Sequence, residues 1–180
     1  MAYGIDYAIL DDFCRVLKQI NVYIWCSKKQ ILPLMKYFID GKGCRFEIIT
    51  WHKTNPIPTV NNKYLSDTEY CLFFRDGAKL GGSFETKGKY YISPINVSDK
   101  DKFEHPTIKP LAFVKNHIIN STKKGDVVLD PFAGSGTTLV AAKELGRQYI
   151  GFELESKWYN IAVNRLNGIM ANGQLSLFLL

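Results

Sequence analysis

The chain has 180 residues, of which 46% are hydrophobic and 22% are charged, and its formal net charge is +6. This composition is ordinary for one globular domain with a full core, and it excludes a disordered or low-complexity chain. No apolar run reaches the length of a membrane span and no signal-peptide pattern is present, so we expect a cytoplasmic protein whose positive charge suits a polyanionic partner.

Helices and strands alternate along the first half of the sequence. We predict a helix over residues 11–18, capped by Asp11 or Asp12, and a second over 31–39 with Pro33 in its first turn. Strands are predicted over residues 22–26, 46–51, 70–74 and 90–92. The prolines and asparagines of residues 53–62 predict a loop.

The second half continues the alternation. Pro110 opens a helix, strands follow over 127–129 and 149–152 with a helix between them, and Ser156 caps the last helix. Strands that alternate with helices predict an α/β fold with a mainly parallel, doubly wound sheet.

A glycine-rich turn follows the strand that ends at Leu129. Gly134 and Gly136 let the backbone approach a ligand closely, and the helix start after them favours an anionic or polar group. Glu153, at the end of the next strand, can accept hydrogen bonds from ribose hydroxyls. Thr137 stands where a P-loop needs Lys, and Leu139 stands where a dinucleotide motif needs its third Gly. The predicted cofactor-binding residues are Asp130, Pro131, Phe132, Ala133, Gly134, Ser135, Gly136, Thr137, Thr138 and Glu153.

The segment Asp130–Thr138 closely resembles the glycine motif of S-adenosylmethionine-dependent amino-methyltransferases that act on DNA. Residues 105–110 resemble the family's other cofactor-contacting motif, with Ile108 where Gln is commoner. The resemblance implies a Rossmann-like methyltransferase fold in the permuted order, with S-adenosylmethionine as cofactor and double-stranded DNA as partner. It adds four residues to the cofactor site, namely His105, Thr107, Lys109 and Pro110.

The same resemblance implies one methyltransferase domain over residues 1–170. Target-recognition loops are expected over about 52–104, the cofactor half over 105–170, and a tail over 171–180. Candidate contacts with phosphates or a flipped base are Lys53, Asn55, Lys63 and Tyr64; the alternative is that these residues belong to ordinary solvated loops.

The family carries an Asp/Asn/Ser-Pro-Pro-aromatic tetrapeptide that accepts the hydrogens of the target amine and stacks on the base. Tyr3-Gly4 matches only the end of this motif, so Tyr3 is the candidate stacking residue and the acceptor side chain is missing. We therefore expect an N-terminally incomplete fold, either because Met1 is an internal start or because the chain is naturally shortened.

The tail after Gly173 resembles the peptide by which bacterial replication proteins dock on the sliding clamp. Gln174 would be its polar anchor, and Leu177 and Phe178 would fill an apolar pocket. The alternative is that these residues pack on their own domain. A second copy of the chain is a further candidate partner.

The cysteines and histidines show no metal-ligand spacing, so no metal site is expected. Two functions remain. The first is a bacterial or phage-encoded DNA methyltransferase acting on an exocyclic amine, with N6 of adenine favoured over N4 of cytosine. The second is a truncated, inactive domain of this kind that binds cofactor or DNA without turnover.

Overall fold

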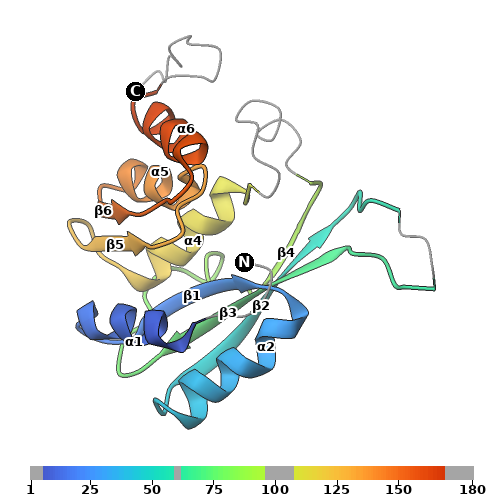
Figure 1. Ribbon diagram of the computed structural model, residues 1–180, viewed down its shortest axis with the longest axis horizontal. Coiled ribbons are helices and arrows are strands. Elements are labelled where there is room, and N and C mark those ends of the chain that lie inside the picture. Colours follow the sequence, from blue (N-terminus) through green and yellow to red (C-terminus); the bar gives the residue numbers. More distant parts are fainter. Residues whose placement is uncertain (1–5, 59–61, 96–107, 169–180) are drawn as a thin grey trace. The chain divides into compact units, whose positions relative to one another are not determined.

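The computed structural model describes residues 6–58, 62–95 and 108–168 (Figure 1). The chain divides into two compact units. The N-terminal unit comprises Met1–Leu80 and Gly88–Ile95, and the C-terminal unit comprises Gly81–Lys87 and Asn96–Leu180. No helix in the described ranges is both long and apolar enough to cross a membrane.

A four-stranded sheet forms the centre of the N-terminal unit. Its strands are β1 (Asn21–Cys26), β2 (Arg45–Lys53), β3 (Thr68–Arg75) and β4 (Tyr90–Ser93), in the order β1-β3-β2-β4. β4 is parallel to β2, as the alternation predicts, whereas β3 is antiparallel to both β1 and β2. The physical reason is the connection: a loop rather than a helix joins β2 to β3, so the chain returns without a crossover.

The helices of this unit begin earlier than the sequence predicts. α1 spans Tyr7–Val16 because Asp6, rather than Asp11 or Asp12, accepts the N–H of Ala8 at 2.9 Å. α2 spans Lys28–Met35, where Ser27 and Gln30 form a capping box. Pro33 therefore lies inside the helix and not in its first turn.

The carboxylate of Asp11 joins α1 to the π-helical turn η1 (Lys36–Asp40) that continues α2. It accepts the Tyr37 hydroxyl at 2.6 Å and the Lys42 ammonium at 2.7 Å. Both bonds favour the ionised carboxylate, and they lower the pKa of Asp11. Asp11 thus stabilises the docking of α1 on η1 instead of the start of the helix.

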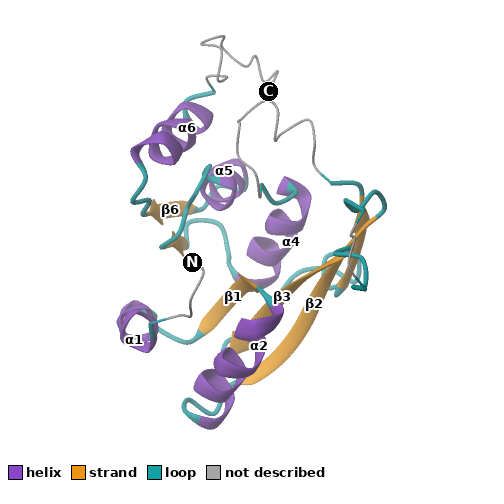
Figure 2. Cartoon of the chain, turned by 45° about the vertical axis from the view of Figure 1, so that its right-hand side comes forward, coloured by secondary structure: helices purple, strands orange, loops and turns teal. Residues whose placement is uncertain are grey.

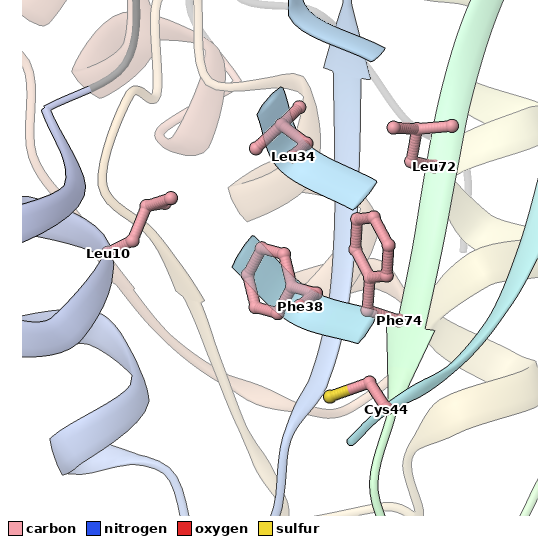
Figure 3. Close-up of a cluster of buried hydrophobic side chains, with 6 residues drawn as sticks. All are labelled: Leu10, Leu34, Phe38, Cys44, Leu72 and Phe74. Atoms are coloured by element: carbon pink, nitrogen blue, oxygen red, sulfur yellow. The ribbon is translucent and has the colours of Figure 1, made fainter. Parts of the chain in front are cut away.

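The main core lies between these helices and one face of the sheet. Figure 3 shows its six buried side chains, which come from α1, α2, η1, β3 and the segment before β2: Leu10, Leu34, Phe38, Cys44, Leu72 and Phe74. The rings of Phe38 and Phe74 stack with centroids 4.4 Å apart. A second cluster, Ile49, Cys71 and Phe73, occupies the opposite face of the sheet. The four cysteines form no disulfide among the described residues.

The C-terminal unit contains three helices and a two-stranded parallel sheet within its described residues (Figure 2). Its elements are α4 (Leu111–Ser121), β5 (Val127–Asp130), α5 (Thr137–Glu144), β6 (Gln148–Gly151) and α6 (Ser156–Leu166). Glu155 rather than Ser156 occupies the N-cap of α6. Val114 and Ile118 of α4 pack against Ala141 and Ala142 of α5.

A turn at residues 81–87 also belongs to this unit because it is bonded to α4. The Asn120 side chain is buried; it donates to the Thr86 carbonyl at 2.8 Å and accepts the Thr86 hydroxyl at 2.6 Å. The Gly81 N–H donates to the Asn120 carbonyl at 2.6 Å. One side chain therefore anchors a turn that lies more than thirty residues earlier in the chain.

Leu34 and Leu32 of α2 provide a matched test of the main core. Leu34 is 1% exposed and Leu32 is 62% exposed. We expect Leu34→Ala to lower the free energy of unfolding by about 2–5 kcal/mol, because it leaves a cavity in the core. Leu32→Ala should change it by less than about 0.5 kcal/mol. Urea unfolding measures both, and equal losses would contradict the assignment of Leu34 to the core.

Candidate functional site

The glycine-rich turn connects β5 to α5 in the C-terminal unit, as the sequence predicts. Gly134 and Gly136 have φ values of 52° and 78°, in the left-handed region that favours glycine. The Gly136 N–H donates to the Ala133 carbonyl at 2.7 Å, which closes the turn just before Thr137 begins the helix. The backbone thus forms a tight hydrogen-bonded turn directly before the first residue of α5.

Glu153 bonds directly to this turn. Parallel pairing sets Asp130 opposite Gly151, so the ends of β5 and β6 lie at the same edge. One carboxylate oxygen of Glu153 accepts the Gly134 N–H at 2.8 Å, and the other accepts the Glu155 N–H at 2.9 Å. The backbone continues this pairing, since the Ala133 N–H donates to the Phe152 carbonyl at 2.9 Å. The sequence-predicted acid and glycine turn are therefore brought together.

Asp130 occupies the start of the same turn. Its carboxylate accepts the Phe132 N–H at 3.1 Å and a hydrogen bond from Thr138. Burial raises the pKa of Asp130 above its ordinary value, the nearby Glu153 carboxylate acts in the same direction, and the two hydrogen bonds oppose them. Burial is the largest of these effects, so ionisation of Asp130 is disfavoured in the folded protein.

Gly136 also allows α6 to approach the turn. A Cβ at Gly136 would lie 2.8 Å from the Cβ of Ala162, closer than carbon atoms pack. Gly151 has a similar role, because a Cβ there would lie 2.5 Å from a methyl carbon of Leu139. Gly136 is therefore needed both for the conformation of the turn and for packing, and Gly151 is needed for packing.

Arg165 of α6 is a site residue that sequence reasoning missed. One guanidinium nitrogen donates to the Ser135 carbonyl at 2.6 Å, the Ser135 hydroxyl at 3.2 Å and the Thr137 hydroxyl at 3.1 Å. Ser135 and Thr137 are buried, so their hydroxyls bind Arg165 in the interior and stabilise the turn. An arginine in the last turn of a helix is common, and the sequence carries no signal for this contact.

Two apolar side chains at the turn remain accessible. Phe132 is 47% exposed, and Leu154, directly after Glu153, is fully exposed. Pro110 is the N-cap of α4, and Lys109 before it is half-buried. The other residues of the predicted site and tail lie outside the described residues: Tyr3, His105, Thr107, Gln174, Leu177 and Phe178.

The candidate DNA contacts of the N-terminal unit divide into two pairs. Lys53 forms an ion pair with Glu69 at 2.7 Å, and the Asn55 side chain accepts the Ile95 N–H at 2.6 Å. Lys63 and Tyr64 are exposed, with Tyr64 97% accessible. The first pair therefore stabilises the unit, and the second is accessible to a partner.

Tyr64 lines a groove of about 390 Å³ at the carboxyl end of β1. Its other lining residues come from the start of α2 and from the segment that leads into β3: Lys28, Leu65, Ser66, Asp67, Thr68 and Tyr70. Sequence reasoning missed Lys28 as a lining residue, because Lys28 and Tyr64 are far apart in the chain and line the same groove only in the folded unit.

The histidines have structural positions. The His52 ring lies between the hydroxyls of Thr50 and Thr68, at 3.0 and 3.3 Å. His117 is buried, and burial lowers its pKa to about 4. Within the described ranges, no three His, Cys, Asp or Glu side chains are grouped as metal ligands.

Comparison with known proteins shows the family of the chain. The sequence model of the family described as DNA methylase (N6_N4_Mtase) matches residues 7–164. The chain therefore belongs to this family, as its glycine motif predicts.

Curated relatives agree with this assignment. Type II methyltransferase M2.MboI of Moraxella bovis is 34% identical over 170 residues, covering 86% of this chain and 62% of the relative. Type II methyltransferase M2.LlaDCHI of Lactococcus lactis subsp. cremoris is 38% identical over 133 residues, covering 66% of this chain and 49% of the relative. The chain thus spans less than two thirds of the length of each of these relatives.

The fold is similar to that of a solved methyltransferase. The crystal structure of the M1.HpyAVI–SAM complex has a TM-score of 0.73 and 29% sequence identity, covering 91% of this chain and 86% of that chain. This similarity confirms the predicted α/β fold of the methyltransferase type.

Gly136 and Gly125 provide a matched test of the turn. Both have positive φ, 78° and 87°, but a Cβ at Gly125 would meet nothing within 4 Å. We expect alanine to cost about 1–2 kcal/mol at either position for the left-handed conformation. Gly136→Ala should cost a further 1–3 kcal/mol or so, because its Cβ overlaps Ala162. Chemical denaturation measures the difference, and equal losses would show that α6 does not press on the turn.

Because the pKa of Asp130 is raised, we expect Asp130→Asn to increase the stability of the folded protein in a pH-dependent way. The asparagine side chain cannot ionise but keeps an oxygen that can accept the Phe132 N–H. The folded state holds the Asp130 proton more tightly than the unfolded chain does. Wild-type stability therefore falls as pH rises from the ordinary value of 3.8 through the raised pKa. We expect the variant to be more stable than the wild type at neutral pH, with the advantage vanishing below 3.8. Urea unfolding over a pH series measures this, and a constant difference would contradict it.

Proposed function

We propose that this protein is a site-specific DNA methyltransferase that moves a methyl group from S-adenosylmethionine to an exocyclic amine of a flipped base. N6 of adenine is favoured over N4 of cytosine. The observation that carries the proposal is the hydrogen bond between the glycine turn and Glu153 at one edge of the β5–β6 sheet. The chain that contains it belongs to the DNA methylase family. M1.HpyAVI, which shares this fold, is described in complex with the same cofactor.

The residues of the turn fit the chemical groups of S-adenosylmethionine. Glu153 is held by two backbone N–H groups and keeps lone pairs that can accept ribose hydroxyls. Exposed Phe132, in the turn, and Leu154, next to the acid in the chain, offer apolar surface, which suits a flat adenine ring. The start of α5 favours the cofactor's carboxylate. When bound, the cofactor supplies an electrophilic methyl group on its sulfonium.

The exposed face at the carboxyl end of β1 is the proposed region for DNA. Lys28 and Tyr64 line the groove there, and Lys63 is adjacent in sequence. Lysines bind phosphates and fix the register of the protein on a duplex, while an accessible aromatic ring can stack on an unpaired base. Lys53 and Asn55 are proposed to act on DNA only through their support of this region.

Transfer itself is tested with the purified chain, labelled S-adenosylmethionine and unmethylated duplex DNA, followed by nucleoside analysis. Label in N6-methyladenine or N4-methylcytosine would establish the activity and identify the base. Folded protein that binds the cofactor but transfers no label would favour the second candidate, a methyltransferase-like domain that binds without turnover. Protein that binds neither cofactor nor DNA would contradict both.

Two matched acids test the cofactor site. Glu153→Gln removes the charge that receives the ribose hydroxyls, and we expect the affinity for S-adenosylmethionine to fall about tenfold to a hundredfold. Glu155→Gln removes an exposed charge two residues away and should leave affinity unchanged. Isothermal titration calorimetry measures both variants, with thermal unfolding as a check on folding. Equal affinities would place the ribose elsewhere.

Three further proposals rest on the sequence. The tail motif at Gln174, Leu177 and Phe178 is proposed to bind a sliding clamp, Tyr3 to stack on the target base, and a second copy of the chain to form a homodimer. A clamp pull-down that is lost in Leu177→Ala/Phe178→Ala would support the first, and retention by that variant would end it.

A further inference from the structure

Two arginines face each other at the end of the N-terminal sheet. Arg45, the first residue of β2, is paired with Arg75, the last residue of β3, in the antiparallel ladder. Residues directly opposite in such a ladder extend their side chains to the same face. Like charges in this arrangement repel, so the pair is unfavourable unless an anion lies between them.

A cavity of about 450 Å³ lies at this pair. Its lining contains three cations and one carboxylate, since Lys79 and Asp76 join the two arginines; Gly43, Gly77 and Ala78 complete it. Among the described residues, no ion pair within 4 Å joins Asp76 to any of these cations. Among the described residues, the lining of the cavity therefore carries more positive than negative charge.

Two hydrogen bonds fix the wall of the cavity. One guanidinium nitrogen of Arg75 donates to the Ala78 carbonyl at 3.0 Å, which holds the turn after β3. The Asp76 N–H donates to the Ile20 carbonyl at 2.9 Å, which joins the same turn to the residue before β1. Arg75 is therefore held in position with further N–H groups available, while Arg45 is exposed.

From this geometry we propose that the cavity binds a phosphate group, with Arg45 and Arg75 donating to its oxygens from two sides and Lys79 adding charge. Guanidinium groups match phosphate oxygens with paired N–H donors, and an anion between them removes the cross-strand repulsion. The phosphate belongs either to a nucleic-acid backbone or to a free phosphoryl compound.

The proposed site is separate from the groove that contains Tyr64. The arginines lie at the beginning of β2, whereas the groove lies at the carboxyl end of β1, which is parallel in direction to β2 because both are antiparallel to β3. Arg75, at the arginine end of β3, and Tyr70, which lines the groove, are five positions apart along that strand, roughly 17 Å, so one ligand phosphate cannot occupy both places. The site therefore goes beyond the proposed methyl transfer and does not depend on it.

The test uses the whole chain and two matched variants. Arg45→Gln removes one side of the proposed site without breaking the Arg75–Ala78 bond. Arg15→Gln removes the same charge from the exposed Arg15–Asp12 pair of α1. Inorganic phosphate, pyrophosphate and a short duplex DNA are titrated in turn at low ionic strength, and amide NMR shifts report binding.

We expect phosphate to shift the amides of Gly43, Arg75 and Gly77, and Arg45→Gln to weaken binding about tenfold while Arg15→Gln leaves it unchanged. If Arg45→Gln also loses about tenfold in affinity for the duplex, and Arg15→Gln does not, the site is assigned to DNA phosphates. Loss for phosphate and pyrophosphate only assigns it to a free phosphoryl compound. Equal binding of all three probes by both variants would overturn the proposal.

Thermal unfolding adds a second readout. Without phosphate, Arg45→Gln should unfold at a higher temperature than the wild type, because the like-charge pair is gone. Phosphate should then raise the unfolding temperature of the wild type and Arg15→Gln more than that of Arg45→Gln. A lower midpoint for Arg45→Gln, with phosphate stabilising all three proteins equally, would also overturn the proposal. Affinity for S-adenosylmethionine, measured on the same samples, reports separately on the proposed function.

Discussion

The hydrogen bond from the Gly134 N–H to the Glu153 carboxylate is the interaction on which the proposed cofactor site of the C-terminal unit depends. It joins the turn after β5 to the residue that follows β6 by two positions, and so continues the parallel pairing beyond the sheet. The same carboxylate also receives the Glu155 N–H and thereby fixes the entry into α6. A single charged side chain thus positions a turn, a strand end and a helix start. That sharing explains why the Glu153 carboxylate is well oriented although the residue is only half-buried.

From α6, Arg165 and Ala162 meet the turn again from its other side. The turn is therefore hydrogen-bonded both to Glu153 after β6 and to Arg165 at the end of α6. The hydroxyls of Ser135 and Thr137 are used in the bonds to Arg165. Phe132 and Leu154 are exposed, and Glu153 is half-buried. The buried polar side chains of the motif thus rigidify its backbone, and the exposed side chains are the ones proposed to contact the cofactor.

Local patterns predicted the parts of this arrangement that local chemistry determines. Gly134 and Gly136 need positive φ, and the acid after a second strand follows from parallel pairing, so both were visible in the sequence. Arg165 and Asn120 were not, because each acts on residues about thirty positions away through folding alone. The antiparallel direction of β3 was missed because the general alternation of helices and strands was taken to mean parallel pairing, although the loop before β3 was itself predicted. The start of α1 was missed because Asp6, Asp11 and Asp12 are chemically equivalent caps, and only the packing of Tyr37 and Lys42 assigns Asp11 to another role.

The anchoring of residues 81–87 by Asn120 has a consequence for how the chain folds. The polypeptide leaves the N-terminal unit after Leu80, returns at Gly88 to form β4, and leaves again after Ile95. The partner of the anchored turn is made much later in synthesis than the first three strands, so closing this long loop carries an entropic cost that adjacent contacts do not. Contacts among β1, β2 and β3 close shorter loops, whereas the turn at residues 81–87 is fixed only once α4 is available to bond to it. The two units consequently cannot be separated by a single cut in the chain, although each has its own core.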